Sequence, residues 1–69
     1  MQIQVKLAVI MAERNVSSKE LAAYVGITEA NLSLLKTGKV KGVRFDTLAK
    51  LCDYLKCQPG DILRATEEE

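Results

Sequence analysis

The 69-residue sequence has no tryptophan, no histidine and only one proline. Without histidine, the chain lacks the side chain most often used as a general base, and Cys52 and Cys57 have no histidine with which to complete a zinc site. No serine nucleophile motif, glycine-rich phosphate loop or metal-ligand spacing is present either. The sequence therefore predicts a protein that is not an enzyme and that needs no metal or cofactor.

Long hydrophobic runs are also missing. No apolar stretch approaches the roughly 20 residues of a membrane span, and the N-terminus does not look like a signal peptide. Two cysteines in such a chain favour reduced thiols, so we expect a cytoplasmic protein with no membrane partner. Cys52 has helical spacing with Leu48, Leu51 and Leu55, which predicts a core position, and Cys57 is expected where that helix ends.

The excess of charge is small, because the formal net charge is only +1. Its distribution is more informative, since three of the nine acids are the last three residues, 67–69. Between Glu29 and Asp46 the chain carries no acid and four cations, which are Lys36, Lys39, Lys41 and Arg44. Phosphates respond to such a local patch rather than to the whole-chain balance.

Apolar spacing predicts four helices and a short fifth turn. The helices are expected at about 5–14, from the cap at Ser17 to Gly26, from the cap at Thr28 to Gly38, and at about 45–56, with the turn at 59–63. This length allows one small domain over residues 1–69, and one small core leaves little room for a small-molecule ligand. We expect the pair formed by the second and third helices to be its central unit, at 18–38. A frayed acidic tail is expected at 67–69.

The second and third helices carry matching start signals. Ser17 is placed as an N-cap, and Glu20 stands where a capping box needs it. Thr28 takes the same position before the third helix. Between the two helices, small Ala22 allows a close crossing, and Gly26 can adopt the positive φ of a tight turn. These features predict a helix-turn-helix.

The sequence resembles the short Cro/cI-type (XRE family) helix-turn-helix proteins of bacteria and phages. The resemblance covers roughly residues 5–63, through MAERN at 11–15, SKELAAYVGIT at 18–28, LSLLKTGKVKGVRF at 32–45, TLAKLCDYL at 47–55 and CQPGDIL at 57–63. It implies an all-α, lambda-repressor-like domain of four to five helices. It also implies a transcriptional regulator, expected to be a repressor, whose partner is double-stranded DNA.

In that family the third helix enters the major groove, which here would be helix 28–37. The resemblance implies that the base-reading residues are Thr28, Glu29, Ala30 and Ser33. It places near the phosphates Ser18, Lys36, Lys39 and Lys41, and the basic run adds Arg44 to this set.

Two residues of the third helix each have two interpretations. Glu29 could accept a hydrogen bond from cytosine N4, or it could be a first-turn acid that stabilises the helix N-terminus. Leu34 could touch a thymine methyl group, or it could contact another protein. The alternative function is therefore a protein-interaction module on the same fold, such as an antitoxin-like or phage-control partner.

Residues 1–5 alternate apolar and polar side chains, which predicts a short N-terminal strand. We expect this strand to pair with 62–66, within one chain or between two. Ala8, Val9 and Ala12 form a second apolar side of the first helix, either as ordinary small surface residues or as a self-association face. Because helix-turn-helix proteins often bind palindromic sites, a homodimer is a further expectation.

Overall fold

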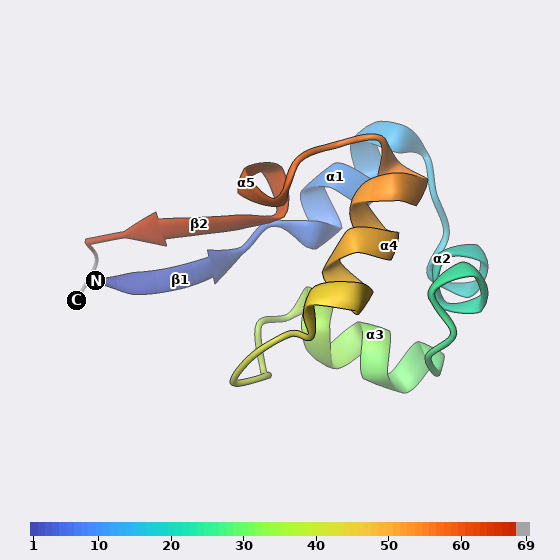
Figure 1. The fold of residues 1–69 in the computed structure, drawn as a ribbon, viewed down its shortest axis with the longest axis horizontal. Coiled ribbons are helices and arrows are strands. Elements are labelled where there is room, and N and C mark those ends of the chain that lie inside the picture. Colours follow the sequence, from blue (N-terminus) through green and yellow to red (C-terminus); the bar gives the residue numbers. More distant parts are fainter. Residues whose placement is uncertain (68–69) are drawn as a thin grey trace.

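The computed structural model describes residues 1–67, which form five helices and a two-stranded sheet (Figure 1). In chain order the elements are β1 (Gln2–Val5), α1 (Leu7–Arg14), α2 (Ser18–Val25), α3 (Glu29–Lys36), α4 (Phe45–Leu55), α5 (Pro59–Ile62) and β2 (Leu63–Thr66). The expected helical fold with a short N-terminal strand is confirmed. Residues 68 and 69 of the expected frayed tail lie outside the described residues. Within residues 1–67, no helix is both long and apolar enough to cross a membrane.

One boundary prediction was wrong. Val5 belongs to β1, and α1 begins only at Leu7, after the cap residue Lys6. The reason is tertiary, because Lys6 N–H donates to the Ile62 carbonyl and so continues the pairing of the two terminal segments. A hydrogen bond across 56 positions of sequence overrides the helical spacing that includes Val5.

All five helices contribute to one apolar core, with α4 packed across the others (Figure 1). Its buried side chains are Leu7, Ile10, Met11, Leu21, Ala22, Val25, Leu32, Leu35, Leu51, Leu55 and Ile62. Cys52 and Cys57 are free thiols, half-buried against this core, and Cys57 follows the end of α4, as expected. Because residues three and four apart share one face of a helix, each long helix buries a stripe and leaves its other side available for binding.

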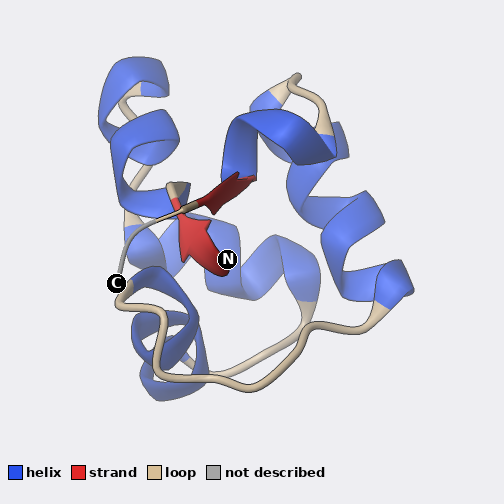
Figure 2. Ribbon diagram, turned by 90° about the vertical axis from the view of Figure 1, so that its left-hand side faces the viewer, coloured by secondary structure: helices blue, strands red, loops and turns tan. Residues whose placement is uncertain are grey.

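The two strands form an arm, defined here as residues 2–5 and 63–66, that projects from the helical body (Figures 1 and 2). They pair antiparallel within one chain, with Gln2 opposite Thr66 and Val5 opposite Leu63. This confirms the expected pairing of the terminal segments and assigns it to a single chain. At the root of the arm Val5 and Leu63 pack against the core, while Ile3 farther out is 65% exposed.

Candidate nucleic-acid interface

The helix-turn-helix is held by local hydrogen bonds at both ends of α2. Ser17 Oγ accepts from Glu20 N–H (3.1 Å) and Glu20 Oε1 accepts from Ser17 N–H (2.8 Å), so the capping box is confirmed. At the other end Gly26 has a φ of +87°, and the N–H groups of Gly26 and Ile27 both donate to the Ala22 carbonyl, at 2.8 and 3.1 Å. The left-handed glycine and these shared bonds set the direction in which the chain leaves α2.

The start of α3 is fixed in the same way. Thr28 Oγ1 accepts from Asn31 N–H at 3.0 Å, which confirms its capping role. Leu32 and Leu35 are buried on the inner face of α3, so this helix cannot rotate about its axis without exposing them. The structure thereby presents one defined outer face of α3.

The four predicted base-reading residues are all exposed, with Thr28 as the N-cap and the other three within α3. Ala30 and Ser33 stand at the centre of its outer face, opposite the buried stripe. Glu29 is exposed and occupies the first turn, where a carboxylate stabilises the helix dipole. Thr28 uses its oxygen as a cap but keeps its hydroxyl hydrogen as a donor.

Two further exposed residues of this surface were missed by the sequence reasoning. Thr37 completes the helical spacing of Ala30, Ser33 and Leu34, and its hydroxyl donates to the carbonyls of Ser33 (3.0 Å) and Leu34 (3.2 Å). Asn31 stands at the flank of α3 and is also exposed. The spacing of four residues from Ser33 was a signal that could have identified Thr37.

Two of the predicted phosphate-contacting residues are brought together by the fold. Lys36 Nζ, at the end of α3, donates to Ser18 Oγ at the start of α2 over 3.0 Å. Both residues are half-buried, so the ammonium group is held close to the helix pair. Ser18 retains its own hydroxyl hydrogen, and Lys36 has two further N–H donors, so both can bind an anion.

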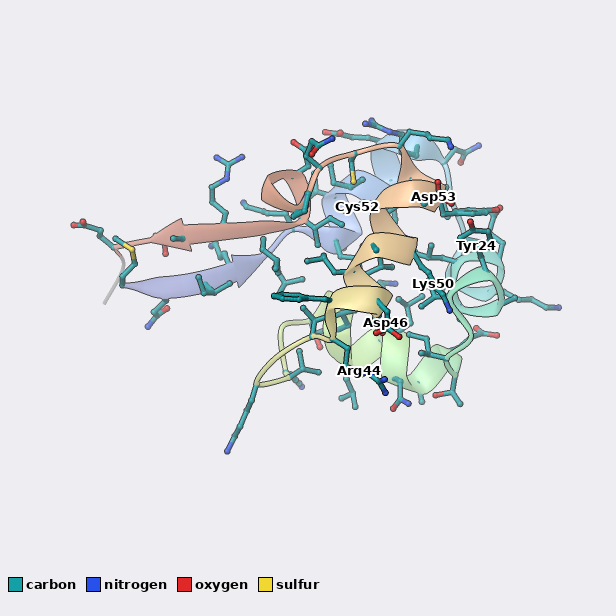
Figure 3. All side chains as sticks on the ribbon, in the orientation of Figure 1. Tyr24, Arg44, Asp46, Lys50, Cys52 and Asp53 are labelled. Carbon is teal, nitrogen blue, oxygen red and sulfur yellow. The ribbon has the colours of Figure 1, made fainter. Side chains whose placement is uncertain are left out.

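The other three predicted phosphate-contacting residues follow α3. Lys39 and Lys41 are exposed in the connection to α4, which Gly38 starts with a φ of +73°. Arg44 precedes α4, and its Nε lies 3.5 Å from Asp46 Oδ1 (Figure 3). Both of these side chains are largely exposed, and ion pairs of that kind are worth at most about 1 kcal/mol. A phosphate can therefore compete with Asp46 for Arg44.

Two tyrosines tie α2 to α4 and so fix the helix-turn-helix on the body. Tyr54 O–H donates to Glu20 Oε2 at 2.6 Å, and Tyr24 O–H donates to Asp53 (Figure 3). The two rings also touch, with centroids 4.8 Å apart. The hydrogen bonds from Ser17 N–H and from the Tyr54 hydroxyl lower the pKa of Glu20, and the bond to Glu20 raises the pKa of Tyr54. The carboxylates of Glu20 and Asp53 thus both accept hydrogen bonds that hold α2 against α4.

Comparison with known proteins relates the chain to a protein family, to a bacterial relative and to a solved structure. The family model for the Cro/C1-type helix-turn-helix DNA-binding domain matches residues 6–68. A Bacillus subtilis (strain 168) protein, YozG, described as an uncharacterized HTH-type transcriptional regulator, is 49% identical over 69 residues, which are 100% of this chain and 82% of that protein. A crystal structure of a Bacteroides fragilis protein proposed to bind DNA superposes with a TM-score of 0.82 at 22% identity, over 91% of this chain and 100% of that one. At that identity the last match concerns the fold alone.

Proposed function

Because the chain belongs to the Cro/C1-type helix-turn-helix DNA-binding family of transcriptional regulators, we propose that it binds specific sequences of double-stranded DNA with α3 in the major groove. The observation that carries this proposal is the exposed outer face of α3, which is followed directly by the acid-free basic segment 36–44. A helix that presents small and polar side chains beside a row of cations suits a groove bordered by phosphates.

Each group of residues has a distinct role in the proposal. The base edges are read by Thr28, Glu29, Ala30 and Ser33, and the phosphates are held by Ser18, Lys36, Lys39, Lys41 and Arg44. Phosphate contacts position the protein without carrying sequence information, whereas base contacts carry it. Occupation of a promoter by such a domain blocks access of polymerase, so repression in the cytoplasm is the regulatory effect that we propose.

Salt dependence tests the binding of phosphates. We expect the Lys39→Ala, Lys41→Ala double variant to bind every duplex more weakly, because two cations are removed. The slope of log affinity against log salt should then flatten by about 0.9 for each phosphate that the variant no longer neutralises. The measurement is a titration of fluorescent random-sequence duplex at several salt concentrations.

Lys56→Asn is the matched control for this titration. It also removes one exposed lysine, but at the end of α4 away from α3, and asparagine tolerates the φ of +55° found there. Its slope should equal that of the native chain. A native slope in the double variant would contradict the phosphate assignment. Selection of bound sites from a random duplex library then identifies the sequence that is read.

A second function is favoured by one observation. Leu34 lies on the outer face of α3 with 45% of its surface exposed, and Glu29 adds a negative charge to that face. An apolar and acidic surface also suits another protein, so the alternative is a protein-interaction module, antitoxin-like or a phage-control partner. Absence of duplex binding at low salt would support this alternative, whereas salt-sensitive binding supports the first proposal.

A further inference from the structure

The outer edge of β1 is a sheet edge without a partner strand in the part of the chain that the structure describes. The sheet has only two strands, so β1 pairs with β2 on one side alone. Neither Ile3 nor Val5 forms a backbone hydrogen bond to any other described segment. Unpaired edges of this kind are templates for a further strand.

The register fixes which groups this edge offers. Lys6 N–H donates to the Ile62 carbonyl, so these opposed residues form a hydrogen-bonded pair of the antiparallel ladder. Hydrogen-bonded and non-hydrogen-bonded pairs alternate, so Ile3 and Val5 occupy non-hydrogen-bonded positions opposite β2. Their N–H and C=O groups therefore point away from β2, toward the outer edge.

The composition of this edge is unusual for an unpaired strand. Residues 1–5 contain no charged side chain and no proline, the two features that most often protect sheet edges. Ile3 and Met1 are 65% and 81% exposed, although both stand on the apolar face of the arm with Val5. The strand is thus suited to pairing.

We propose that β1 of a second copy of this chain pairs antiparallel with this edge, about a two-fold axis between the two Ile3 residues. In that register each Ile3 N–H donates to the other Ile3 carbonyl, and Val5 faces Met1 of the second copy. The result is a continuous four-stranded sheet in the order β2, β1, β1, β2. The pairing is isologous, because the same groups are offered by both copies.

The same register supplies an occupant for a hollow beside the arm. This hollow, of about 210 Å³, is lined mainly by the apolar side chains of Ile3, Val5, Val40, Val43 and Leu63. Met1 of the second copy would stand opposite Val5 with its side chain on the same face, next to the hollow. A flexible thioether side chain fills irregular apolar gaps well.

Charge favours a second copy as the partner of this edge. The side chains of residues 1–5 are uncharged, so the pairing of two copies brings no like-charged side chains together across the two-fold axis. A charged foreign strand would find no side-chain counter-charge on these residues. The pairing through β1 needs no DNA, so it does not depend on the proposed function.

Sedimentation equilibrium of the full chain without DNA tests the pairing. We expect the mass of two chains at high micromolar concentration, and the mass of one chain for Ile3→Glu, because that change places two carboxylates against each other on an apolar sheet face. The matched control is Val9→Glu on α1, which alters an exposed apolar residue outside the arm and should remain dimeric. A native monomer throughout, a dimeric Ile3→Glu or a monomeric Val9→Glu would each overturn the proposal.

An engineered disulfide tests the register separately. Opposed residues of a hydrogen-bonded antiparallel pair have Cα atoms about 5.5 Å apart, within the range that a disulfide spans. Ile3→Cys should therefore form a covalent dimer on mild oxidation, whereas Gln2→Cys should not, because Gln2 would stand opposite Gln4. The native chain controls for Cys52 and Cys57. Equal cross-linking at both positions, or none at Ile3→Cys, would contradict the register.

Discussion

At residue 26 the backbone has a φ of +87°, a conformation that side chains with a Cβ resist. The sequence predicted this position because a glycine follows a helical stripe. Asn15 ends α1 in the left-handed region with a φ of +58°, and asparagine is a residue type that tolerates this conformation. Lys56 adopts the same conformation at the end of α4, and nothing in its residue type predicted it. There Cys57 N–H donates to the Cys52 carbonyl and both side chains pack against the core, so packing sets the backbone.

Gly26→Ala isolates the cost of this turn. An added Cβ would meet nothing within 4 Å, so only backbone strain opposes the change. We expect the free energy of unfolding to fall by roughly 1–2 kcal/mol, measured by urea denaturation. The matched control is Gly60→Ala in α5, where the space is also open and φ is not positive, and this variant should be neutral or slightly more stable. Equal decreases in the two variants would contradict the assigned role of Gly26.

Among the elements, α2 and α3 were the most predictable from sequence. Their caps, turn and apolar stripes depend on residues within four positions of one another, so the signals are local. The side-chain contacts that fix α2 on α4 and α3 on α2 were not predictable, because they join distant positions. Tyr54 reaches Glu20 across 34 positions and Lys36 reaches Ser18 across 18. The base-reading assignments stay predictions, since base recognition depends on the DNA sequence as well as on α3.

Acid should weaken the attachment of α2 to α4. Hydrogen bonds from Ser17 N–H and from the Tyr54 hydroxyl favour the ionised form of Glu20 and lower its pKa from 4.5. The folded state therefore gains stability from Glu20 above its unfolded pKa, and loses it as the pH falls through the lowered folded pKa. We expect the native urea midpoint to decline below about pH 4.5 more steeply than that of Glu20→Gln.

Glu13→Gln is the control for this pH series. Glu13 is exposed and contacts only the neighbouring Arg14 among the described ion pairs, so its removal should leave the steep decline intact. If native protein and Glu20→Gln gave parallel profiles from neutral to acid pH, the stabilising role of this carboxylate would be wrong. The comparison uses the full chain in each case and requires no DNA.

The whole molecule is elongated, with extents of 34 × 21 × 20 Å and the arm at one end of the long axis (Figure 1). Its proposed phosphate-binding residues belong to α2, α3 and the connection to α4, whereas three of its nine acids follow β2 at the C-terminus. The low net charge thus combines a basic segment with a separate acidic one. Under the proposed function, this distribution combines local contacts to phosphates with a weak overall attraction to DNA.

Replacing the three C-terminal glutamates with glutamine, in the Glu67→Gln, Glu68→Gln, Glu69→Gln variant, tests this balance by raising the formal net charge from +1 to about +4 without altering the basic segment. We expect faster association with duplex DNA at low salt, because long-range attraction increases while the local contacts stay the same. The increase should fade near 0.15 M salt, where charges more than about 8 Å apart are largely screened. Stopped-flow fluorescence measures the rate, and an increase that persisted at high salt would mean that these acids compete directly for the DNA-binding residues.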